Sequence, residues 1–232
     1  MTTKMVFHGS DIEKICDYYH LNKEDIVKFG ANVNPLGLSA SVKKEIAENV
    51  DLFSSYPDRD YVSLRNTISE YCRIPAEFIL PGNGSSELIS LLIQERAPKH
   101  TLILGPTYSE YSRELSFSGS TQEYYHLREE RNFTLDVEDL CKTLENGYDF
   151  LILCNPNNPT SSAIMQEDLR KLIAFCSGKN IFVMIDETYV EFAPDINAVT
   201  AVPAANQAAR DAQAKKRVIR RILWQNRMFF QM

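Results

Sequence analysis

The chain has 232 residues, of which 44% are hydrophobic and 24% charged, so we expect a folded protein of one or two domains with a sizeable core. No apolar stretch approaches the roughly 20 residues that span a bilayer, and residues 1–11 lack the apolar segment of a secretory signal. The five cysteines are an odd number without a C-x-x-C pair, which argues against a disulfide framework. The sequence thus predicts a cytoplasmic protein with no membrane partner.

Charge is distributed unevenly along the chain. The net charge of −6 combines +6 for residues 204–232, which hold seven Lys or Arg and one acid, Asp211, with −12 for residues 1–203. An acidic body repels a polyanion over most of its surface, so we expect no nucleic-acid partner. The four scattered histidines have no H-E-x-x-H spacing, so no metal site is expected.

The first eighty residues carry turn signals around short helical segments. Asn-Pro-Leu-Gly at residues 34–37 and Tyr-Pro-Asp at residues 56–58 are typical of turns. Helices are expected at residues 41–49 and 61–71. This part of the chain therefore reads as an N-terminal arm followed by short helices.

From residue 99 onward, apolar runs alternate with helical patterns, and one further helix is expected before them. Gly82-Asn-Gly84 is expected to be a loop that feeds a helix over residues 85–94, capped by Ser85 and Ser86. Continuous apolar runs suit strands buried on both faces, and their alternation with helices implies a parallel sheet. The expected strands are residues 101–105, 150–154 and 181–185, and the expected helices are residues 137–144 and 169–175, closed by Gly147 and Gly178.

Informative residues follow each of these strands. Gly105-Pro-Thr-Tyr108 follows the first, Asn155-Pro-Asn-Asn-Pro-Thr160 the second, and Asp186-Glu-Thr-Tyr189 ends the third. Ligands bind at the carboxyl ends of the strands in an open parallel sheet. We therefore expect an aromatic ring, amides and a carboxylate to converge on one crevice.

Asp186 and Tyr108 each have two interpretations. An ionised Asp186 at the end of a buried strand needs a cation such as a protonated pyridine nitrogen, but a helix N-cap or a buried ion pair is the simpler alternative. Tyr108 suits stacking on a flat ring, and equally suits packing in the core. Neither residue decides between a ligand site and a structural role.

Two loops offer further groups to a ligand. The prolines of residues 155–160 fix the backbone and present three asparagines in a rigid turn, although a plain Asn-Pro turn is the alternative. The loop at residues 82–86 precedes a helix, whose free N–H groups and positive dipole end suit a phosphate. That loop lacks the Gly-Lys-Ser/Thr ending of a nucleotide P-loop.

Taken in order, these motifs resemble those of fold-type I pyridoxal-phosphate enzymes of the class I/II aminotransferase group. Within the group, the chain looks most like threonine-phosphate decarboxylases of cobalamin synthesis and histidinol-phosphate aminotransferases of histidine synthesis. The resemblance implies an α/β fold with a three-layer α/β/α large domain around a mostly parallel sheet. The motifs that carry it are Phe7-His-Gly9, Phe29-Gly-Ala-Asn-Val-Asn-Pro-Leu-Gly37, Tyr56-Pro-Asp58, Pro81-Gly-Asn-Gly84, Cys154-Asn-Pro-Asn-Asn-Pro-Thr160 and Asp186-Glu187.

The resemblance implies pyridoxal 5′-phosphate as the cofactor. Gly84, Ser85 and Ser86 would bind its phosphate. Tyr108 would stack on the pyridine ring, and Asp186 would pair with the ring nitrogen and strengthen the electron sink.

It also implies contacts to the rest of the ring, to the substrate and to a second subunit. Asn158 and Tyr189 would hydrogen-bond the 3-oxygen of the ring. Tyr56 would reach the cofactor phosphate of the neighbouring subunit, which implies a homodimer. His8 and Asn32 would lie near a phosphorylated amino acid substrate. Loss of the substrate carboxylate would make the enzyme a decarboxylase, and loss of the α-proton would start transamination.

The last residues depart from the family pattern. The family places a Ser-x-x-Lys, followed by Gly-x-Arg, about thirty residues beyond Asp186, and the chain has neither motif. Lys215 and Lys216 fall near that distance, but no strand is expected before them and no glycine follows, so the Schiff-base lysine is unidentified. We expect a chain that is truncated or frame-shifted near residue 204, lacks the C-terminal small domain and is inactive as it stands.

The pattern therefore predicts three parts. Residues 1–40 would form an arm and part of the small domain, residues 41–203 the incomplete cofactor-binding domain, and residues 204–232 an unrelated basic tail. A hypothesis of a different class is a non-catalytic or regulatory protein, in which residues 217–227 form an amphipathic helix that docks on an acidic partner.

Overall fold

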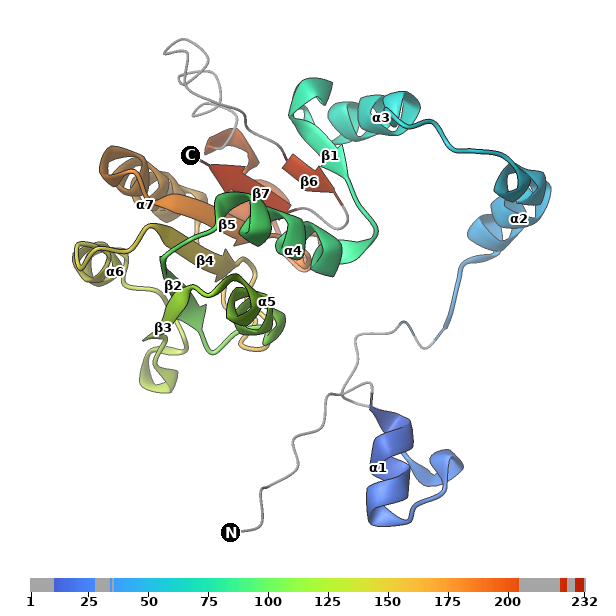
Figure 1. Ribbon diagram of the computed structural model, residues 1–232, viewed down its shortest axis with the longest axis horizontal. Coiled ribbons are helices and arrows are strands. Elements are labelled where there is room, and N and C mark those ends of the chain that lie inside the picture. The colour runs from blue at the N-terminus through green and yellow to red at the C-terminus, as the bar shows by residue number, and fades with distance from the viewer. Residues whose placement is uncertain (1–10, 28–33, 35, 205–221, 225–227, 232) are drawn as a thin grey trace. The chain divides into compact units, whose positions relative to one another are not determined.

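The computed structural model describes residues 11–27, 34, 36–204, 222–224 and 228–231 and divides the chain into two compact units, 1–57 and 58–232 (Figure 1). The boundaries expected after residues 40 and 203 stay predictions. Within the part of the chain that the structure describes, every helix is too short or too polar to span a bilayer.

The first unit contains two α-helices in its described part, α1 (Ile12–Tyr19) and α2 (Ala40–Glu48), and 3₁₀ turns at Lys23–Asp25 and Val50–Ser54. The helix expected at residues 41–49 is confirmed, and the hydroxyl of Ser39 caps it by accepting the backbone N–H of Val42 over 3.3 Å. No side chain of α2 is buried. Its apolar residues are therefore exposed in the single chain.

The second unit alternates strands and helices as the sequence predicts. Its helices in the described residues are α3 (Val62–Cys72), α4 (Gly84–Arg96), α5 (Glu110–Ser118), α6 (Val137–Leu144), α7 (Gln166–Lys179) and α8 (Ile196–Val199). Its strands are β1 (Ile79–Pro81), β2 (His100–Gly105), β3 (Thr121–His126), β4 (Phe150–Cys154), β5 (Phe182–Asp186), β6 (Ile222–Trp224) and β7 (Met228–Gln231).

The described strands form one sheet in the order β1-β6-β7-β5-β4-β2-β3. Every pair is parallel except the two that involve β7, which runs antiparallel to β5 and β6. The expected mostly parallel sheet is confirmed. The helix hypothesised for residues 217–227 is wrong where the structure describes it, because Ile222–Trp224 pairs with β1 as strand β6. β-branched and aromatic residues favour that extended backbone.

Two apolar layers enclose the sheet, because successive side chains of a buried strand point to opposite faces. Leu151 and Leu153 of β4 join α6 and α7 in one cluster, while Ile152 of the same strand joins α4 and α5 in the other (Figure 1). The three-layer α/β/α arrangement expected from the resemblance is confirmed.

One helix boundary differs from the prediction. Gly178 lies inside α7, whose last helical residue is Lys179. The residue that caps the helix is Asn180, with a left-handed φ of 58°. Asparagine tolerates that conformation and replaces glycine as the C-terminal residue of the helix.

Candidate active site

The candidate site lies where β2, β4 and β5 end. These strands are adjacent and parallel, and their register places Cys154 opposite Asp186 at the last residue of each strand. The segments that follow therefore leave the same edge of the sheet, which is where ligands bind in this architecture.

Asp186 is a buried carboxylate, 3% exposed. Its Oδ2 accepts the hydroxyl of Tyr111 over 2.7 Å, and its Oδ1 accepts the backbone N–H and the hydroxyl of Thr188 over 2.9 and 2.6 Å. Burial raises the pKa of Asp186, and these hydrogen bonds act in the opposite direction. None of the ion pairs among the described residues involves Asp186. The expected alternative of a buried ion pair is thus not seen in that part of the chain.

Tyr108 contacts both Tyr111 and the start of α4. Its half-buried ring packs edge-on against Tyr111, with centroids 5.6 Å apart and an interplanar angle of 85°. Burial raises its pKa, Glu110 raises it further, and a hydrogen bond with Ser86 lowers it. The charges of Asp186 and Tyr189 also act on Tyr108. The structure therefore brings these predicted residues together.

The N-terminus of α4 presents backbone donors beside Tyr108. Gly84 has a φ of 91°, a left-handed conformation that favours glycine, and it is the first residue of the helix. The prediction that the serines cap α4 is wrong: Asn83 holds the cap position, and Ser85 and Ser86 lie within the first turn. Because N–H groups of a first helical turn lack partners within the helix, this turn suits an anion.

The three asparagines of the loop after β4 have different roles. The amide of Asn155 donates to the carbonyls of Ile164 and Val199 and accepts the N–H of Ile164. Asn157 is bound within the protein as well, through Pro106, Thr107 and Thr160.

Asn158 differs from both. Its side chain is half-buried and has no hydrogen bond to the rest of the described chain. Of the three amides in this rigid loop, the one at Asn158 is left for a ligand.

Tyr189 lies near Tyr108, whereas the other predicted residues belong to the first unit or fall outside the described residues. Tyr189 is half-buried, with its ring 6.3 Å from that of Phe192. Tyr56 belongs to the first unit and is 97% exposed. His8, Asn32, Lys215 and Lys216 lie outside the described residues.

Sequence reasoning missed Tyr111 and Thr188, which are the partners of Asp186. Tyr111 stands three residues after Tyr108, in the first turn of α5. Thr188 stands two residues after Asp186, where a hydroxyl and an N–H readily bond to an aspartate. Both spacings were visible in the sequence.

Comparison with known proteins agrees with this geometry. Residues 24–219 match the profile of the family described as aminotransferase class I and II. The chain belongs to the class I and II aminotransferase family. A family member from Salmonella typhimurium, a threonine-phosphate decarboxylase, is 33% identical over 81% of this chain and 51% of its own length. A histidinol-phosphate aminotransferase from Methanococcus aeolicus is 30% identical over 81% of this chain and 50% of its own.

Solved structures of the family have the same fold. The histidinol-phosphate aminotransferase from Clostridium acetobutylicum superposes with a TM-score of 0.68 at 30% identity, over 76% of this chain and 51% of that one. The resemblance predicted from the motifs is confirmed. The chain spans about half the length of the family members it matches.

Proposed function

We propose that the chain binds pyridoxal 5′-phosphate at the carboxyl edge of β2, β4 and β5, as part of an enzyme that acts on a phosphorylated amino acid. The observation that carries the proposal is the buried carboxylate of Asp186, which has hydrogen-bond donors but no cation among its described partners. A buried carboxylate is unfavourable without a positive partner. A protonated pyridine nitrogen has the required charge and size.

The other residues of the site fit the same ligand. The first turn of α4, with Gly84, Ser85 and Ser86, would hold the phosphate. The ring of Tyr108 would stack on the pyridine, and Asn158 and Tyr189 would donate hydrogen bonds to the 3-oxygen. When bound, the cofactor draws electrons from a bond at the α-carbon of the substrate amine. The residues of the chain hold the ring charged and in a fixed plane, and no lysine is assigned as its point of attachment.

The substrate class follows from the relatives. A threonine-phosphate decarboxylase and a histidinol-phosphate aminotransferase both carry a phosphorylated substrate in their names. We favour a threonine-phosphate decarboxylase-like role, with a histidinol-phosphate aminotransferase as the alternative, and place His8 and Asn32 near the substrate. Competition between threonine phosphate and histidinol phosphate for binding to the chain would show which of the two substrates it prefers.

A homodimer is part of the proposal. Tyr56 is 97% exposed, and Leu36, Phe53 and Leu52 of the same unit are 89%, 79% and 66% exposed. Contact with a second subunit would cover such apolar side chains. All five cysteines are free, which supports a reducing compartment such as the cytoplasm.

Cofactor binding tests the proposal directly. We expect pyridoxal 5′-phosphate added to the purified chain to bind saturably in equilibrium dialysis, and Asp186→Ala to weaken binding by about a hundredfold, as removal of one partner of a buried charge pair does. Asp168→Ala is the matched control, since that acid lies on the exposed face of α7. Borohydride reduction and peptide mapping would then identify any lysine attached to the cofactor. Equal binding by the Asp186→Ala variant would contradict the proposal.

A further inference from the structure

We infer that Tyr111 and Thr188 are positioning residues, which together keep Asp186 ionised and leave one acceptor position of its Oδ2 for a cationic ring nitrogen. The inference rests on the proposed function for the identity of the cation. The ionisation of Asp186 itself is independent of that function.

The geometry gives each carboxylate oxygen a distinct environment. Thr188 donates two hydrogen bonds to Oδ1, at 2.9 Å from its N–H and 2.6 Å from its hydroxyl, while Tyr111 donates one to Oδ2 at 2.7 Å. An ionised carboxylate accepts about four hydrogen bonds, two on each oxygen. Oδ1 is therefore saturated, and Oδ2 retains one open position.

Both side chains donate without bringing charge. Burial and the nearby carboxylate raise the pKa of Tyr111 well above its usual value, so its hydroxyl remains a donor at any physiological pH. A threonine hydroxyl does not titrate. An arginine in either place would neutralise Asp186 and remove its attraction for a ligand cation, whereas two hydroxyls stabilise the anion and keep its charge.

The groups that face Asp186 add no positive charge in the described part of the chain. Cys154 on β4 is neutral because burial raises its pKa to about 12. Tyr108 on the loop after β2 is also protonated, since burial raises its pKa. Glu187 accepts hydrogen bonds from the hydroxyl of Thr200 and the backbone N–H of Ala201. The hydroxyls of Tyr111 and Thr188 are thus the main groups that favour the charged form of Asp186.

Tyr111 contacts both the carboxylate of Asp186 and the ring of Tyr108. Tyr111 belongs to α5 and is fully buried in the apolar cluster that α4, α5 and the sheet form together. Its ring packs edge-on against the ring of Tyr108. Its position is therefore set by packing rather than by Asp186. A phenylalanine would keep that packing and remove only the hydrogen bond.

Infrared spectroscopy of the chain without cofactor tests the ionisation. A protonated carboxylic acid has a C=O stretch that a carboxylate lacks, and subtraction of the Asp186→Asn spectrum isolates the signal of Asp186. We expect no acid band from Asp186 at pH ~7 in the unchanged chain and a clear band in the double variant Tyr111→Phe, Thr188→Ala, because hydrogen bonds to a charged group stabilise it. An acid band in the unchanged chain, or none in the variant, would overturn the inference.

Binding of pyridoxamine phosphate tests the consequence for the ligand. This probe has the same ring nitrogen and needs no lysine. We expect the single variants Tyr111→Phe and Thr188→Ala to bind it about tenfold more weakly at pH ~7. The pH below which the affinity falls should be higher in each variant than in the unchanged chain. Tyr125→Phe is the matched control, because it removes a tyrosine hydrogen bond to the surface acid Asp139.

The outcomes distinguish the inference from the proposed function. Unchanged affinity and pH profile in both variants would overturn the inference while the cofactor still binds. Failure of the unchanged chain to bind the probe, with the expected infrared result, would overturn the proposed function and leave the roles of the two hydroxyls supported. Circular dichroism melting of each variant shows whether the fold is retained.

Discussion

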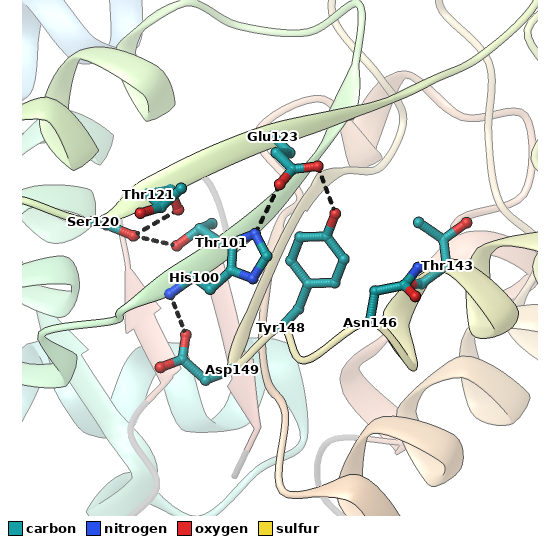
Figure 2. A network of polar contacts seen from close by, with 9 residues as sticks. All are labelled: His100, Thr101, Ser120, Thr121, Glu123, Thr143, Asn146, Tyr148 and Asp149. Carbon is teal, nitrogen blue, oxygen red and sulfur yellow. Dashed lines mark hydrogen bonds and ion pairs between the residues drawn. The ribbon is translucent and has the colours of Figure 1, made fainter.

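The hydroxyl of Tyr148 donates a hydrogen bond of 2.9 Å to Oε2 of Glu123, and His100 Nε2 lies 3.0 Å from the other oxygen of that carboxylate (Figure 2). The imidazole and phenol rings pack with centroids 4.1 Å apart. The carboxylate of Asp149 accepts the backbone N–H of His100 over 3.0 Å. This network ties the amino-terminal ends of β2 and β4 to β3, at the opposite ends of these strands from the candidate site.

The network predicts a pH-dependent stability. Hydrogen bonds from His100 and then Tyr148 lower the pKa of Glu123. Since the folded pKa lies below the unfolded one, Glu123 stabilises the fold above the unfolded pKa and loses this effect as pH falls through the folded value. We expect Tyr148→Phe to lower the urea midpoint at pH ~7 and the difference to narrow toward pH ~3, below the usual glutamate pKa.

Tyr124→Phe is the control for that experiment, because the Tyr124 hydroxyl has no hydrogen bond to the described residues. It should not change the midpoint at either pH. If Tyr148→Phe lowers the urea midpoint equally at both pH values, then packing, rather than the charge of Glu123, accounts for the loss of stability.

Cysteine reactivity provides a second prediction. Cys154 and Cys176 are 2% and 0% exposed, and burial raises the pKa of each thiol to about 12. The thiolate is the reactive form, so both should resist iodoacetamide at pH ~8 in the folded chain and react once urea unfolds it. Cys16 is half-exposed and should react first. Mass spectrometry of the labelled peptides gives the order, and early labelling of Cys154 would contradict the burial of β4.

The sequence predicts the central strands well because they are buried on both faces. Each contains an uninterrupted apolar run, which is residues 102–104 in β2, 150–154 in β4 and 182–185 in β5. By contrast, β3 is the edge strand Thr-Gln-Glu-Tyr-Tyr-His, with mainly exposed side chains, and its pattern does not differ from that of a loop. Strand β1 has three residues and is defined by its partners rather than by its own sequence.

The site is predictable in its position but not in the role of each residue. Asn155 and Asn158 both precede a proline in one short loop, and only the contacts with Ile164 and Val199 show that Asn155 is structural. The sequence places Tyr111 three residues after Tyr108 but does not show that its hydroxyl bonds to Asp186, because a tyrosine on an amphipathic helix is equally typical of a core residue.

Two glycines make a matched pair for steric effects. A Cβ on Gly82 would lie 2.3 Å from Cδ2 of the fully buried Leu88, whereas a Cβ on Gly178 would meet nothing within 4 Å. We expect Gly82→Ala to destabilise the fold by about 1–3 kcal/mol through overpacking. Gly178→Ala should stabilise it by about 0.5–1 kcal/mol, because alanine loses less backbone entropy in a helix. Urea unfolding measures both, and a neutral Gly82→Ala would show that Leu88 has room to move.

The two asparagines after β4 separate folding from binding within one loop. Asn155→Ala removes three buried hydrogen bonds and leaves the carbonyl of Val199 and both backbone groups of Ile164 without their partner. We expect it to lower the free energy of unfolding by about 2–4 kcal/mol, because buried polar groups without partners are costly.

Asn158→Ala should leave the unfolding free energy unchanged within about 0.5 kcal/mol, since its side chain has no hydrogen bond to the rest of the described chain. It should instead weaken binding of pyridoxal 5′-phosphate about tenfold, the typical effect of one lost hydrogen bond to a polar ligand atom. Urea unfolding and equilibrium dialysis on the same two variants test both statements. A stable Asn155→Ala variant with weakened binding, or an unstable Asn158→Ala variant with normal binding, would reverse the roles assigned to the two amides.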